Sequence, residues 1–142
     1  LYNQAAIDLD LAILLCETAA DIDRQLIFYG LAHSFMAEAA DTVGLSFVAE
    51  AFADRAYTQD RTLVPRNQPG AVIADTEVIS AQVLSMVKQQ PIRTIDGEWI
   101  DLQADTICLH GDHKNSLQTA QSLNSRILES GIKIQAPSKA ES

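Results

Sequence analysis

The chain has 142 residues, of which 19 are acidic and 10 basic, and its formal net charge is −9. A chain of this length is expected to form one domain, over residues 1–142, that buries about two thirds of its unfolded surface. Its acidity makes nucleic acid and anionic membranes poor partners, and no apolar run reaches the roughly 18 residues of a membrane-spanning helix. Cys16 and Cys108 lie in apolar patterns, so both are expected to be buried in a reduced, cytoplasmic protein.

The first half of the chain alternates between two kinds of apolar pattern. Spacings of three and four residues indicate amphipathic helices, and short continuous apolar runs indicate buried strands. The expected elements are a helix over 3–20, a strand over 25–29, a helix over 34–43 and a strand over 45–51. Asn3 or Asp8 is expected to cap the first helix and Ser34 the second, while Gly30 ends the first strand and Gly44 the second helix.

The second half begins with a long polar loop over residues 52–73. The expected elements after it are a helix from 75 to before 91, a hairpin over 92–102, a strand over 105–109, a helix over 114–130 and an edge strand over 132–134, with a frayed tail over 136–142. Asp75 is a natural N-cap for the first of these helices, and Asp96-Gly97 is a strong signal for a tight turn.

Strands that alternate with helices predict an α/β fold with a mainly parallel sheet. The carboxyl ends of parallel strands lie at one edge of the sheet, which is where α/β folds bind their ligands. Polar residues follow the expected strands at this edge, namely His33, Glu50, Asp54, Arg55 and residues 110–113. The sequence therefore predicts a candidate active site there.

One candidate cluster is His110, Gly111 and Asp112, directly after the strand expected over 105–109. An imidazole and a carboxylate two residues apart can act as general acid and base, or hold a metal ion. The alternative is structural: Asp112 caps the helix that begins near Lys114, and His110 only ends the strand. The N–H groups at that helix start, together with Lys114, would also suit a phosphate or carboxylate ligand.

The second candidate cluster lies in the loop and contains Asp54, Arg55, Tyr57 and Arg66. Arginines in such a loop commonly hold carboxylate or phosphate groups in a bidentate fork. The alternative is an internal ion pair between Asp54 and Arg55 that staples the loop. The sequence contains no serine elbow, P-loop, glycine-rich dinucleotide fingerprint or paired Cys-x-x-Cys motif, which argues against a covalent hydrolase.

Four segments resemble, in order and spacing, the C-terminal half of the LamB/YcsF family. They are Phe52-Ala-Asp-Arg-Ala-Tyr57, Leu63-Val-Pro-Arg66, Gln68-Pro-Gly-Ala-Val-Ile73 and Asp105-Thr-Ile-Cys-Leu-His-Gly-Asp112. The opening Leu1-Tyr2-Asn3 resembles the end of the family's central His-Gly-Ala-Leu-Tyr-Asn motif. The resemblance covers nearly all of the chain and implies that the family's N-terminal half is missing from it.

The resemblance implies about half of a seven-stranded (β/α) barrel of the glycoside hydrolase/deacetylase type. It also implies ATP-dependent opening of 5-oxo-L-proline to L-glutamate in a complex with the B and C subunits of 5-oxoprolinase. ATP, with Mg²⁺ as its companion ion, would be the cofactor, and no organic prosthetic group is implied. Carried over to this sequence, the catalytic residues are His110, Asp112 and Asp54, and those that bind substrate or phosphate are Arg55, Tyr57 and Arg66.

Two positions depart from the family pattern. Arg61 stands where the family usually has glycine after the aspartate of the loop, which is expected to alter the turn. His113-Lys114 replace a small pair such as Thr-Pro, which weakens the expectation of a phosphate contact at the following helix start.

Two further hypotheses remain beside this one. The first is a metal-dependent hydrolase of carbohydrate or amide substrates, with His110 and Asp112 as metal ligands. The second is an inactive fragment or interaction module, because half a barrel exposes two sheet edges that the missing strands would cover.

Overall fold

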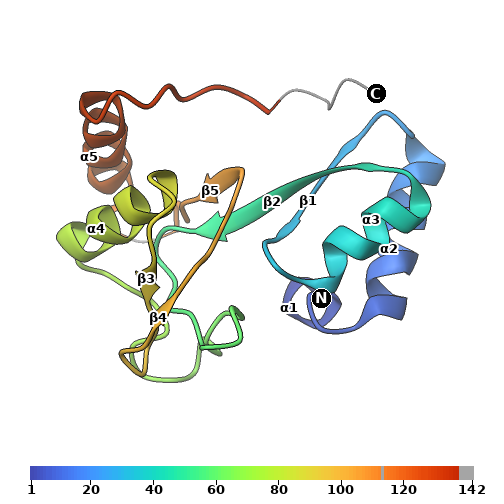
Figure 1. The fold of residues 1–142 in the computed structure, drawn as a ribbon, viewed down its shortest axis with the longest axis horizontal. Helices are drawn as coiled ribbons and strands as arrows, with labels where there is room; N and C mark the ends of the chain where they lie inside the picture. The colour runs from blue at the N-terminus through green and yellow to red at the C-terminus, as the bar shows by residue number, and fades with distance from the viewer. Residues whose placement is uncertain (113, 138–142) are drawn as a thin grey trace. The chain divides into compact units, whose positions relative to one another are not determined.

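The computed structural model describes residues 1–112 and 114–137 (Figure 1). Their contacts group them into two compact units, and the sequence predicted one domain over residues 1–142. The first unit contains residues 1–50, 104–106 and 137, and the second contains residues 51–103 and 107–136. His113 and most of the tail expected to be frayed lie outside the described residues.

The first unit contains three helices and parts of the parallel strands. Its elements are α1 (Tyr2–Ala5), α2 (Leu9–Ile22), β1 (Ile27–Leu31), α3 (Phe35–Val43) and most of β2 (Ser46–Phe52). Ser34 caps α3 by accepting a hydrogen bond from Met36 N at 3.2 Å, and Gly44 ends it with a left-handed φ of 80°, as predicted.

The helix predicted over residues 3–20 is in fact two helices. The chain breaks between them because the Asp8 side chain accepts a hydrogen bond from Leu11 N and so begins a new first turn. The apolar spacing predicted a buried face that includes Leu14, but α2 buries Ala12, Cys16 and Ala20 and leaves Leu14 57% exposed. These small residues suit the close packing of α2 beside α3 (Figure 1).

Gly30 lies inside β1, so the prediction that it ends the strand is wrong. A Cβ at this position would lie 2.7 Å from the Phe47 ring and 2.8 Å from Met36 Cβ. Close packing against neighbouring side chains therefore requires the glycine. The prediction that both faces of this strand are buried is also wrong, since Tyr29 is 42% exposed.

The strands form a parallel sheet in the order β1-β2-β5, with β5 at Thr106–Cys108. β1 pairs in parallel with β2, from Ile27 opposite Ser46 to Leu31 opposite Glu50. Two backbone hydrogen bonds connect the segments around β2 and β5, from Asp105 N to Ala49 O and from Ala53 N to Cys108 O, each 2.8 Å. They advance in the same direction along both segments, as in a parallel pair. The predicted α/β class is confirmed.

The second unit packs two helices beside each other (Figure 1). Its elements are α4 (Thr76–Val87), β3 (Ile92–Arg93), β4 (Trp99–Ile100), the end of β5 and α5 (Ser116–Glu129). A core of Ala53, Ile79, Val83 and Leu123 joins α4 and α5 to the end of β2. The apolar spacing predicted Val78, Leu117 and Leu128 on the inner faces of these helices, and this part of the prediction is wrong because all three are exposed.

The hairpin predicted around Asp96-Gly97 is confirmed. Ile92 and Arg93 of β3 pair in antiparallel register with β4, and Gly97 N donates to Thr94 O at 3.0 Å. Gly97 has a φ of 89°, which favours glycine. The edge strand predicted over residues 132–134 is not formed, since this exposed segment has no regular structure.

Cys16 is wholly buried, and its burial raises the pKa of its thiol. Cys108 is only half-buried, although the sequence predicted both cysteines to be buried. No helix among residues 1–112 and 114–137 combines the length and apolar character that crossing a membrane requires.

Candidate active site

The loop over residues 52–73 begins inside the core at Phe52, the last residue of β2, and has no helix or regular strand after that residue, as predicted. Its first polar side chains are nearly inaccessible: Asp54 is 1% exposed, Arg55 3% and Tyr57 0%. Isolated bridges connect Arg55 with Val72 and Tyr57 with Leu63. Buried polar groups of this kind need hydrogen-bond partners within the protein, and the loop supplies those of Arg55 and Tyr57.

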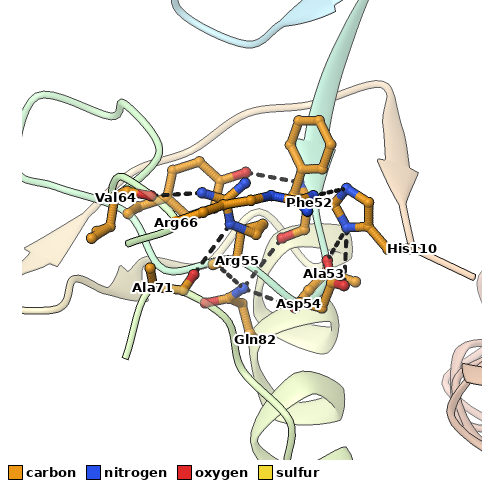
Figure 2. Close-up of polar contacts among 10 residues, drawn as sticks. Phe52, Ala53, Asp54, Arg55, Val64, Arg66, Ala71, Gln82 and His110 are labelled. Atoms are coloured by element: carbon orange, nitrogen blue, oxygen red, sulfur yellow. Dashed lines mark hydrogen bonds and ion pairs between the residues drawn. The ribbon is translucent and has the colours of Figure 1, made fainter. Parts of the chain in front are cut away.

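Gln82 of α4 holds the start of the loop in place. Its side-chain nitrogen donates to the carbonyl oxygens of Phe52, Ala53 and Arg55 at 3.3, 3.0 and 3.0 Å (Figure 2). Gln82 is not among the site residues predicted from the sequence. The available signal was its place next to Val83 on the buried side of a helix, where a polar residue is unusual.

Arg55 fastens two distant parts of the same loop. Its Nε donates to Ala71 O at 3.2 Å and its Nη2 donates to Val64 O at 2.6 Å (Figure 2). Burial, with the nearby positive charge of Arg66, lowers the pKa of this guanidinium from its usual value, while the Asp54 carboxylate acts in the opposite direction. The structure thus gives Arg55 a structural task, and its predicted contact with substrate stays a prediction.

Tyr57 also has a partner inside the protein. Its hydroxyl oxygen accepts a hydrogen bond from Phe52 N at 2.7 Å. This contact fixes the backbone at the end of β2. The predicted role of Tyr57 in binding substrate stays a prediction.

Arg61 stands in the turn where the family pattern has glycine. Its φ of 62° lies in the left-handed region that glycine favours, and its N donates to Thr58 O at 3.1 Å. Its Nε donates to Asp101 O at 2.9 Å. The turn is therefore formed with arginine in the conformation that suits glycine.

The buried Asp54 carboxylate binds the imidazole of His110. His110 Nδ1 lies 2.8 Å from Oδ1 and 3.0 Å from Oδ2 of Asp54. The His110 side chain is 23% exposed, and its ring stacks on Phe52 with 5.5 Å between centroids. The imidazole is therefore held on one nitrogen and on one face.

Arg66 binds the other ring nitrogen of His110. Its Nη2 lies 2.9 Å from His110 Nε2, and Figure 2 shows the arginine side chain extending toward the ring. A guanidinium can only donate, so Nε2 is the acceptor in this contact. The proton of a neutral imidazole then sits on Nδ1 and is donated to Asp54. This order fixes one tautomer of His110.

The structure brings together three of the six predicted site residues, Asp54, Arg66 and His110. Asp112 is exposed, and its side chain makes no hydrogen bond to any residue in the described ranges. The alternative that it caps α5 is wrong, because the N-cap is Asn115, without a side-chain hydrogen bond. The carboxylate that orients His110 is Asp54, and a catalytic role of Asp112 stays a prediction.

His33 and Glu50, which the sequence placed at the same edge, belong to the first unit. Glu50 accepts a hydrogen bond there from the Tyr2 hydroxyl at 2.8 Å.

Metal binding was the alternative chemistry proposed for His110. Within residues 1–112 and 114–137, no three His, Cys, Asp or Glu side chains are grouped closely enough to hold a metal ion. Both nitrogens of His110 already have partners, so ligation of a metal by His110 and Asp112 would require one of these contacts to break.

The fold and the site define an α/β protein with a carboxylate, an imidazole and a guanidinium linked in series after a parallel strand. The model of the LamB/YcsF family matches residues 1–142, and the chain belongs to this family. This confirms the resemblance found in the sequence.

Relatives agree with this assignment. The chain is 47% identical over 134 residues to the A subunit of 5-oxoprolinase from Thermococcus sibiricus, covering 94% of this chain and 52% of that protein. It is 47% identical over 136 residues to the A subunit of 5-oxoprolinase from Limosilactobacillus fermentum, covering 96% of this chain and 55% of that protein. The chain thus spans about half the length of these relatives.

A solved structure shows the same fold. The lactam utilization protein from Thermus thermophilus is 30% identical and superposes with a TM-score of 0.84, over 95% of this chain and 53% of that chain.

Proposed function

We propose that the chain is the C-terminal half of the A subunit of an ATP-dependent 5-oxoprolinase, which opens 5-oxo-L-proline to L-glutamate. The observation that carries the proposal is the 47% identity to proteins named as the A subunit of 5-oxoprolinase. The pairing of His110 with Asp54 supports it, because hydrolysis of an amide needs a base to activate water. The proposed complete fold is a seven-stranded (β/α) barrel of the deacetylase type, of which this chain forms about half.

His110 is the proposed base. Asp54 accepts the Nδ1 proton and so directs the lone pair of Nε2 outward, toward the place where a water can be deprotonated. The buried carboxylate also stabilises the imidazolium that forms when Nε2 takes this proton. In this proposal Asp54 orients the base and does not itself contact substrate.

ATP is the proposed co-substrate because a five-membered lactam is a poor electrophile. Phosphorylation of the lactam carbonyl oxygen would make its carbon easier to attack, and cations are then needed to hold the transferred phosphate. Arg66 is exposed and suits this task. Mg²⁺ travels with nucleotide phosphates and needs few protein ligands, so it would enter with ATP. The B and C subunits of 5-oxoprolinase are the proposed partners.

The test is a chimera in which this chain replaces the matching half of the Thermococcus sibiricus relative. The chimera is mixed with the B and C subunits, ATP and 5-oxo-L-proline, and L-glutamate is measured. ATP-dependent release of glutamate is expected, and His110→Ala should lower it at least about a hundredfold, as expected for loss of a general base. A folded chimera that forms no glutamate contradicts the proposed function. Unchanged turnover of the His110→Ala chimera removes the base assignment alone.

A further inference from the structure

Arg66 occupies the atom of His110 that the proposed base must use. The guanidinium of Arg66 donates to Nε2 of His110, the nitrogen that must accept a proton from water. While this hydrogen bond is present, the lone pair of Nε2 is occupied. The site as it stands therefore holds its base in a blocked form.

The guanidinium is well placed to leave this contact. Arg66 is exposed, and among the described residues His110 is its hydrogen-bond partner, so most of its five N–H donors face solvent. The buried Arg55 guanidinium lies near enough for the positive charge of Arg66, together with burial, to lower the pKa of Arg55. The two guanidinium charges outnumber the single negative charge of the nearby Asp54 carboxylate, so the site favours the arrival of an anion.

An anion offers Arg66 a stronger partner than the imidazole does. A carboxylate or phosphate can accept two parallel hydrogen bonds from one guanidinium and also neutralise its charge, whereas neutral Nε2 accepts one. An anion bound beside the ring should therefore draw Arg66 away from His110.

We propose that Arg66 is an anion-responsive cap on His110: a carboxylate or phosphate of the substrate binds the Arg66 guanidinium and thereby frees Nε2 to act as the base. The inference rests on the proposed function for the nature of the substrate. It couples binding to activation, so that water is activated only when an anionic reactant is in place. Two groups of the proposed reaction have the required chemistry, the carboxylate of 5-oxo-L-proline and the phosphate transferred from ATP.

The test observes the nitrogen atoms of His110 directly and needs no turnover. The chain is labelled with nitrogen-15 in its 3 histidines, and His110→Gln identifies the signals of interest. Spectra are recorded at about pH 8, above the usual titration range of histidine. Inorganic phosphate, 5-oxo-L-proline and pyrrolidin-2-one, a lactam without a carboxylate, are added in separate titrations. Arg66→Ala is the test variant, and Arg24→Ala, which removes an exposed arginine of the first unit, is the control.

In the unmodified chain and in Arg24→Ala, phosphate or 5-oxo-L-proline is expected to move the Nε2 signal toward its position in anion-free Arg66→Ala. Pyrrolidin-2-one should leave it in place. Arg66→Ala should raise the anion concentration needed for half-saturation by at least about tenfold, as expected for loss of a charged hydrogen bond. The anion that acts at the lower concentration identifies the source of the charge.

Three results would overturn the proposal. They are identical Nε2 signals in the anion-free chain and in Arg66→Ala, saturable anion binding that leaves Nε2 unchanged, and the same response to anions with and without Arg66. None of these results depends on glutamate formation. The proposal of a cap can therefore be wrong while the proposed activity is right, and the proposed activity can be wrong while the cap is right.

Discussion

Two polar segments follow neighbouring strands of the sheet, and they are built differently. After β2, residues 53–57 are buried, and Gln82, Arg55 and Tyr57 tie that segment to its surroundings. After β5, Gly111 and Asp112 are exposed, and α5 begins without a side-chain cap. Among the described residues of the two segments, the side-chain contact that joins them is that of His110 with Asp54. A polar segment at a strand end thus forms an ordered site where its side chains are buried, because buried polar groups need hydrogen-bond partners within the protein.

Replacing the two arginines of the loop should give the largest contrast. Arg55→Met removes the side-chain donor to Val64 O and leaves Ala71 O with only its backbone donor, Ala56 N, so it should lower the free energy of unfolding by about 2–4 kcal/mol. Arg66→Met, the matched control, alters an exposed side chain and should change it by less than about 0.5 kcal/mol. Urea unfolding followed by circular dichroism measures both. Equal losses would show that burial does not separate the two residues.

Asp54→Asn should have the next largest effect. The amide keeps the shape of the carboxylate but loses its charge beside His110 and Arg55, which should cost about 1–3 kcal/mol in the same unfolding experiment. In the chimera, turnover should fall by about a hundredfold or more, because the imidazole loses the group that fixes its tautomer. Normal turnover with normal stability would mean that Asp54 does not orient the base.

Local signals predicted local structure well. Ser34, Asp75 and Gly97 each act within a few residues, and each has the role that its neighbours in sequence indicated. The prediction that Gly30 ends a strand failed because the glycine is required by close packing against the Phe47 ring, which sequence spacing does not show. The prediction that Leu117 is buried failed for a similar reason. Periodicity shows which face of a helix is apolar, but not which neighbouring element covers that face.

The sequence predicted which residues belong to the site better than it predicted the contacts between them. Family resemblance named Asp54, Arg66 and His110, and the structure links them. The resemblance could not show that Asp54 rather than Asp112 binds the imidazole, because that choice depends on how two strand ends are placed in space. Nor could it separate Arg55 from Arg66, since burial distinguishes them and residue type does not.

The starts of α4 and α5 offer a smaller contrast. Asp75 accepts hydrogen bonds from Glu77 N at 2.8 Å and Val78 N at 3.3 Å, so Asp75→Ala should cost about 1 kcal/mol. Asn115 makes no such bond, and Asn115→Ala should cost no more than a few tenths of a kcal/mol. Urea midpoints of the two variants, compared at equal slope, give the difference. Equal costs would mean that α5 is capped in solution.

The smallest effect is expected for Asp112→Ala, which tests the exposed side of the comparison. With no hydrogen bond to a described residue, its loss should change the free energy of unfolding by less than about 0.5 kcal/mol. In the chimera it should lower turnover less than Asp54→Asn does, because Asp54 alone of the two carboxylates contacts His110. A larger loss of turnover than that of Asp54→Asn, at unchanged stability, would mean that Asp112 contacts the reacting substrate. The second strand end would then contribute directly to the chemistry, and the ordered site would extend beyond the residues that packing holds in place.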